Sequence, residues 1–287
     1  MNVAIGMAVL LITVFGGYLL GGGAMGPILH ALPLEGMMII GAAVGALFAG
    51  NSMHEVKAVG GGFKRIFKGP QHNKQDHIDA IALSTKLMKM LKSEGPVALE
   101  SHVNDPANSA IFAEYPNILA NKPLTGLICD TLTLIVVSSG TLETHAVEDV
   151  MDHAMKTHFH DMAGPQHALS TMADALPALG IVAAVLGIVK TMGSINEPPA
   201  ILGAMIGSAL VGTFLGILLA YGIFGPFAGR CRQVIESDAA IYHVVKQIII
   251  ASLNGHPLPL VIEAARSGIT HSNQPAFADV FDGMRSR

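Results

Sequence analysis

Residues 198–229 contain no Asp, Glu, Lys or Arg, and two arginines follow almost at once. A bilayer core about 30 Å thick accommodates about 20 helical residues. The segment is long enough and is rich in Leu, Ile, Val, Ala and Gly, so it predicts a membrane-spanning helix. It also contains Thr213, Tyr221 and Pro226, and such groups are tolerated at membrane depth where protein or water satisfies them. We therefore expect this helix to be packed within an assembly.

The composition agrees with an integral membrane protein that has a sizeable polar part. Hydrophobic residues make up 51% of the 287 residues and charged residues 13%, with a mean hydropathy of +0.51. Ordinary soluble domains are about 25% charged. The net charge is −4 and no basic stripe is present, which argues against nucleic acid as a partner and leaves membrane lipids as the expected surroundings.

Three further segments read as spans: residues 3–20, 36–53 and about 173–193. The chain is therefore predicted to be all-α, a polytopic membrane protein with four transmembrane helices and a helical cytoplasmic domain. Three glycine pairs on these spans have small-xxx-small spacing, which allows helices to approach closely. These pairs, which we interpret as packing positions, are Gly41 and Gly45, Gly203 and Gly207, and Gly212 and Gly216.

Lysine and arginine set the expected orientation. Ten of the 17 basic residues lie in residues 54–170, and six more follow residue 229. The positive-inside rule then places the long loop, the tail and both termini in the cytoplasm. The expected organisation is 1–53 for transmembrane helices 1 and 2, 54–170 for a helical cytoplasmic loop, 171–229 for transmembrane helices 3 and 4, and 230–287 for a cytoplasmic tail. We expect the loop helices to be continuous with spans three and four.

No signature of an enzyme is present. The sequence has no P-loop, no GxSxG and no HExxH motif, and its two cysteines match no metal-ligand spacing. We therefore predict neither catalysis nor a cofactor or metal site. A substrate transporter would be expected to have inverted repeats and its own polar site at the midplane, and neither is visible.

Four blocks resemble the MotA family of flagellar-motor stator proteins. They are DALPALGIVAAVLGIVK (174–190), GSALVGTFLGILLAYGIFGPFA (207–228), SHVNDPANSAIFAEYP (101–116) and SLNGHPLP (252–259). The resemblance implies a multi-pass protein of the bacterial inner membrane, assembled as five copies around two copies of the single-span partner MotB. Ion flow through this stator would turn the rotor by contacts with the rotor protein FliG. The alternative is an ExbB/TolQ-like energiser of outer-membrane transport, but those chains are shorter and have three spans.

Two prolines are candidate coupling elements. Pro177 lies near the start of span three and Pro226 near the end of span four, so opposite chain directions place both at one level near the cytoplasmic face. Each proline removes a backbone donor and loosens its helix. Together with the resemblance, this predicts that they couple ion passage to movement of the cytoplasmic part.

The resemblance also implies rotor-facing charges. Lys92 stands where the family usually has Arg, and Glu100 stands where it has Glu, on either side of a Gly95-Pro96 break. Lysine keeps the positive charge but loses the bidentate fork of a guanidinium.

The predicted coupling ion is H⁺, with Na⁺ less favoured. Sodium-driven relatives carry Thr where this chain has Ala184, and an alanine offers no oxygen ligand. We expect Ala184, Thr213 and Tyr221 to line the ion pathway and face the partner helix. Between their charged ends, none of the four expected spans contains Asp or Glu, so the protonatable group must come from MotB, whose helix carries an Asp in the family.

Overall fold

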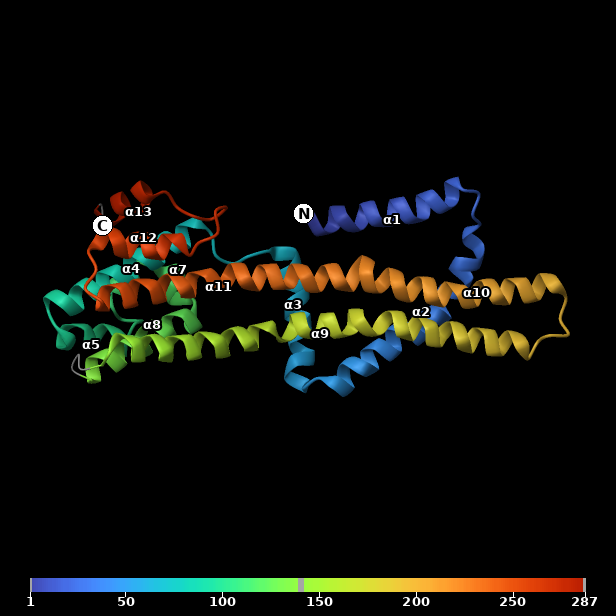
Figure 1. Cartoon of the computed structure of the whole chain (residues 1–287), viewed down its shortest axis with the longest axis horizontal. Coiled ribbons are helices and arrows are strands. Elements are labelled where there is room, and N and C mark those ends of the chain that lie inside the picture. Colours follow the sequence, from blue (N-terminus) through green and yellow to red (C-terminus); the bar gives the residue numbers. More distant parts are fainter. Residues whose placement is uncertain (1, 139–141, 286–287) are drawn as a thin grey trace. The chain divides into compact units, whose positions relative to one another are not determined.

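The computed structural model describes residues 2–138 and 142–285, and every regular element in these ranges is a helix. This confirms the predicted all-α class (Figure 1). The elements are α1 Asn2–Leu20, α2 Met25–Gly50, α3 Met53–Lys68, α4 Lys74–Ser93, α5 Pro96–Asn104, α6 Ala110–Ala113, α7 Pro116–Ala120, α8 Lys122–Val137, α9 Thr144–Met192, α10 Pro199–Ile217, the π-helix η1 Leu218–Phe224, α11 Gly225–Leu253, α12 Leu258–Ser267 and α13 Phe277–Arg285.

The chain forms two compact units. The membrane unit consists of Met1–Gly69 and Ala163–Val234, and the second unit of Pro70–Met162 and Ile235–Arg287. Helices α9 and α11 each contribute residues to both units, as expected for loop helices continuous with spans three and four.

In the part of the chain that the structure describes, four helical stretches are long and apolar enough to cross a membrane, which confirms the predicted number of spans. They lie in α1, α2, α9 and the run from α10 through η1 into α11. Large apolar side chains remain exposed on α1, α9 and α10, including Ile12, Leu20, Val189 and Leu210. Such surfaces are suited to lipid or to neighbouring helices.

The second span differs from the prediction. Helix α2 begins at Met25 rather than at residue 36, and it contains Pro33 and Glu35. Pro33 and Glu35 resemble loop residues in sequence, but a proline is tolerated within a membrane helix when its neighbours satisfy the freed backbone. The expectation that no span contains Asp or Glu between its ends is therefore wrong, because Glu35 lies inside α2 and is buried.

The fourth span changes geometry before it ends. The α-helical hydrogen bonding of α10 gives way to the π-helix η1, where the Gly225 N–H donates to the Ala220 carbonyl five residues earlier. Pro226 follows directly and has no N–H to donate. Pi-helical turns are rare and occur frequently at functional sites.

Glycines set the contact between α9 and α10. A methyl group on Gly180 would lie 2.9 Å from the Gly212 carbonyl oxygen, and one on Gly216 would lie 2.7 Å from the Leu176 carbonyl oxygen. Further along, a methyl group on Gly187 would lie 2.6 Å from the Ala209 Cβ. The two helices therefore meet backbone to backbone at these positions, as small residues permit.

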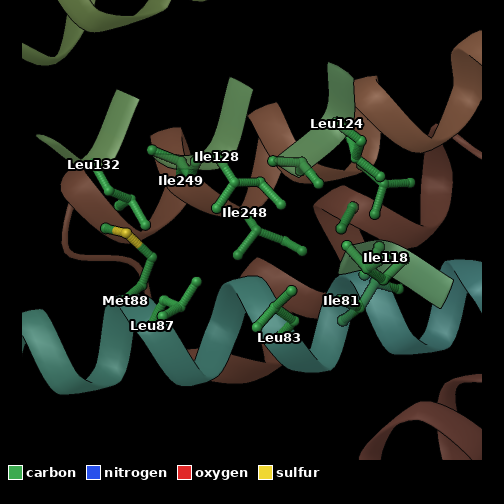
Figure 2. Close-up of a cluster of buried hydrophobic side chains, with 14 of the residues drawn as sticks. Ile81, Leu83, Leu87, Met88, Ile118, Leu124, Ile128, Leu132, Ile248 and Ile249 are labelled. Atoms are coloured by element: carbon green, nitrogen blue, oxygen red, sulfur yellow. The ribbon is translucent and has the colours of Figure 1, made fainter. Parts of the chain in front are cut away.

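The second unit has its own hydrophobic core (Figure 2). Helix α4 contributes Leu83 and Leu87, whose side chains point towards Ile128 and Leu132 of α8 and Ile248 of α11. Polar groups are also enclosed here. Burial, with the neighbouring charge of His72, lowers the pKa of His77 to about 4, although Asp76 opposes this shift. His77 is therefore neutral at physiological pH.

A buried lysine joins α11 to the segment of α9 in the same unit. Lys246 is 7% exposed, and its Nζ donates to both carboxylate oxygens of Asp152 at 2.7 and 2.8 Å. It also lies 2.9 Å from a Glu148 carboxylate oxygen. Nearby, the Gln71 N–H donates to the buried Asp238 carboxylate at 2.7 Å. These contacts hold the part of α11 from residue 235 onward in the second unit, because separating it would leave the buried Lys246 and Asp238 side chains without these partners.

Candidate functional site

Two of the three predicted pathway residues lie along the contact between α9 and α10. Ala184 is 7% exposed, and its backbone nitrogen would be 3.4 Å from a methyl group on Gly212. Thr213 follows Gly212 on α10 and is half-buried. The structure thus brings Ala184 and Thr213 to one level of the two helices. Ala184 is largely covered by its own chain, so its contact with a partner helix stays a prediction.

Tyr221 lies apart from that pair, within the π-helix η1. Its side chain is 74% exposed in the chain. A tyrosine ring combines an apolar body with a polar hydroxyl, so this position is suited to a boundary between protein and water or a partner. Its assignment to the ion pathway also stays a prediction.

The two prolines are not level with each other. The glycine contacts pair Gly187 with Ala209 and Leu176 with Gly216, and this antiparallel register places Pro177 opposite the start of η1. Pro226 follows η1 and is therefore displaced along the helix by about seven residues, or about 10 Å. The expectation of a shared level is wrong by about two turns. The structure instead pairs Pro177 with the π-helical segment.

Glu35 is the functional candidate that the sequence reasoning missed. It is 5% exposed, and a methyl group on Gly212 would lie 2.6 Å from its Oε2. Its carboxyl therefore reaches α10 beside Thr213. A sequence signal was available, since the apolar pattern continues on the N-terminal side of Glu35 through Leu32 and Leu34.

Lys92 and Glu100 lie on the surface of the second unit. Lys92 is in the last turn of α4, and Glu100 is in α5; both are exposed. Gly95, with φ of 88°, makes the sharp turn between the two helices, and Pro96 begins α5. Positive φ favours glycine, and proline is favoured in the first turn of a helix, so local chemistry explains the bend.

A groove of about 840 Å³ lies beside Lys92. Its lining combines three basic side chains with apolar ones from the C-terminal helices, and includes Lys86, Lys89, Lys92, Tyr115, Leu253, His256, Val261 and Phe281. Lys86 is paired with Glu114 at 2.6 Å. The rim near Lys92 is therefore a basic surface suited to an acidic partner.

The remaining candidates for reactive chemistry are metal-binding clusters and the two cysteines. Within residues 2–138 and 142–285 there is no cluster of three His, Cys, Asp or Glu side chains placed to hold a metal ion. Cys129 and Cys231 are buried free thiols. Burial, with a smaller effect from Asp130, raises the pKa of Cys129 to about 12, so this thiol is protonated and a poor nucleophile.

Two family models match the chain. The motility protein A N-terminal model matches residues 4–95, and the MotA/TolQ/ExbB proton channel family model matches residues 120–243. The first match covers the two N-terminal spans, and the second includes the contact between α9 and α10.

Curated relatives align over all or nearly all of the chain. Motility protein A of Escherichia coli (strain K12) is 37% identical over 286 residues, covering 100% of this chain and 96% of the relative. Chemotaxis protein LafT of Vibrio parahaemolyticus is 32% identical, covering 95% of this chain and 94% of the relative.

Solved structures share the fold. A chain of the C. jejuni MotAB structure matches with a TM-score of 0.72 at 19% identity, covering 94% of this chain and 96% of that one. The flagellar MotAB stator complex from Bacillus subtilis gives a TM-score of 0.68 at 19% identity, covering 91% and 92%. The sequence relationship and the four spans together show that this chain is a multi-pass inner-membrane protein belonging to the motility protein A family, within the MotA/TolQ/ExbB proton channel family.

Proposed function

We infer that this chain is the ion-conducting stator subunit of a bacterial flagellar motor and works with a MotB partner. The observation that carries this inference is the full-length alignment with motility protein A, which includes the two N-terminal spans. The same feature disfavours the ExbB/TolQ-like alternative. A membrane channel and torque generator has no need of a catalytic constellation, and we propose no enzymatic activity.

The assembly we propose contains five copies of this chain around two MotB helices, with both termini in the cytoplasm. Exposed apolar faces on α1, α9 and α10 support burial against lipid and other copies. The basic residues of the 54–170 loop and the tail support a cytoplasmic second unit. FliG is the proposed partner of the surface that carries Lys92 and Glu100.

The proposed coupling ion is a proton. A sodium ion that sheds its water needs several oxygen ligands, and Ala184 provides none from its side chain. Thr213 offers one hydroxyl at the same level, enough to help hold a thin water path to the Asp of MotB.

Deleting the gene is expected to leave flagella assembled but cells unable to swim, and the wild-type gene should restore swimming. In the restored strain, replacing sodium with potassium at fixed pH and ionic strength is expected to leave swimming speed unchanged. Non-motile cells without flagella would contradict the stator function. Speed that collapses without sodium would leave the stator function intact and contradict proton coupling.

Reversing the charges of Lys92 and Glu100 together is expected to reduce torque while membrane level, MotB assembly and ion flow stay normal. An exposed pair of opposite charges contributes about 0–1 kcal/mol, so either single reversal should be mild. Torque is measured from the rotation of tethered cells. Lys156→Glu is the matched control, because Lys156 is an exposed lysine on a different helix, α9. Normal torque in the double variant would exclude this surface as a rotor contact.

A further inference from the structure

Glu35 is an acidic side chain enclosed within a membrane span. It lies ten residues after Met25, or about 15 Å along α2, so it is well inside the bilayer. Its side chain is buried, and Oε2 has no hydrogen-bond partner among the described residues. In a hydrocarbon environment, a charge in this state is unfavourable unless it is paired or neutralised.

The elements around Glu35 supply no compensating charge. Helix α10, which it contacts, has no titratable side chain over Pro199–Ile217. On the neighbouring α9, the titratable groups flanking Ala184 are Asp174 and Lys190, and Lys190 is about 9 Å further along the axis. His30 lies more than one helical turn before Glu35 on α2. The first titratable residues of α3 are His54 and Glu55, beyond the end of α2.

Gly212 makes the room that the carboxyl occupies. A methyl group there would lie 2.6 Å from Oε2, closer than van der Waals contact, and 3.2 Å from the Ala183 Cβ. The carboxyl is therefore held against a bare stretch of α10 backbone. The next residue along that helix is Thr213, the half-buried hydroxyl beside Ala184.

We propose that Glu35 is a proton-binding site of this chain, whose carboxyl carries a proton at neutral pH and lies against Gly212 at the contact between α2 and α10. A protonated carboxyl is uncharged, so it is compatible with this enclosed apolar position. Loss of the proton would leave a carboxylate that must attract water or a cation. Entry of either would weaken the contact between α2 and α10 next to Thr213. The chain would thus hold a protonatable group of its own, in addition to the one that the stator function assigns to MotB.

The protonation state can be measured directly by infrared spectroscopy. The wild-type chain and Glu35→Gln are each produced with MotB in membranes, with and without ¹³C at the glutamate carboxyl carbons. We expect the wild-type spectrum at pH 7 to contain a protonated-carboxyl band that shifts with the label and disappears in Glu35→Gln. The band should persist at pH values where exposed glutamates are ionised. Glu94→Gln, which changes an exposed glutamate, should leave the band in place.

Glu35→Asp guards against a glutamine variant that fails to fold. In that variant the band should respond to ¹³C-aspartate instead of ¹³C-glutamate. A wild-type spectrum with no such band at pH 7, or a band that still responds to ¹³C-glutamate in both variants, would overturn the proposal. The measurement needs no rotation, so a band in a chain that fails to restore swimming would support the proton site and contradict the stator function.

Discussion

Replacing Gly216 by Ala is expected to remove most of the folded chain from the membrane and to abolish swimming. The added methyl group would lie 2.7 Å from the Leu176 carbonyl oxygen and 2.9 Å from the Gly180 Cα. Both are backbone atoms, so no side-chain rotation can relieve the clash and α9 must separate from α10. Overpacking of a core typically costs about 1–3 kcal/mol, and separating two spans also removes the neighbouring contacts at Gly180 and Gly187.

Gly207→Ala provides the matched control. Gly207 lies on the same helix and belongs to the same kind of small-residue pair, but a methyl group there would have nothing within 4 Å in the chain. Alanine also has a better helix propensity than glycine by about 1 kcal/mol, so this variant should be at least as stable. Membrane level and thermal unfolding in detergent report the difference. A Gly216→Ala chain with wild-type level and unfolding temperature would show that the two spans are not in close contact.

The glycine pairs show how well a spacing of four residues predicts close contact between helices. Sequence spacing identified six candidate glycines. Of these, the structure places Gly212 and Gly216 in close contact with α9. For Gly41, Gly45, Gly203 and Gly207, a methyl group would meet nothing within 4 Å in the chain. A spacing of four residues places two glycines on one face of a helix, but it does not determine whether that face packs against another helix. The latter four remain available for contacts between chains or with lipid.

Hydropathy predicted the number of spans because roughly twenty apolar residues in succession have few alternatives to a membrane helix. It failed at the start of α2, where Pro33 and Glu35 resemble loop residues in sequence although both lie inside the helix and Glu35 is buried. The π-helix η1 was also beyond prediction, because its sequence LLAYGIF is an ordinary apolar run. The buried pairing of Lys246 with Asp152 and Glu148 depends on residues almost a hundred positions apart, so no local pattern indicates it.

Changing Pro177 to Ala is expected to stop swimming while leaving the chain, its partner and the membrane level intact. Proline removes one i to i−4 hydrogen bond from α9 and its ring presses on the preceding turn, so this part of the helix bends more easily. The register with α10 places that weak point opposite η1, where hydrogen bonding is also irregular. Two loosened segments side by side form a joint at this level of the two helices. Alanine would restore the missing hydrogen bond and stiffen one side of the joint.

Pro226→Ala tests the other side. It restores a donor just after η1 and should favour regular α-helix there, so its effect should match that of Pro177→Ala if the two segments work as one joint. Pro199→Ala is the control, because a proline in the first turn of a helix replaces an N–H that has no partner within the helix. Swimming, membrane level and co-purification with MotB are compared for all three variants. Normal swimming in both Pro177→Ala and Pro226→Ala would exclude the joint, whereas loss of protein from the membrane would assign the prolines to folding instead of coupling.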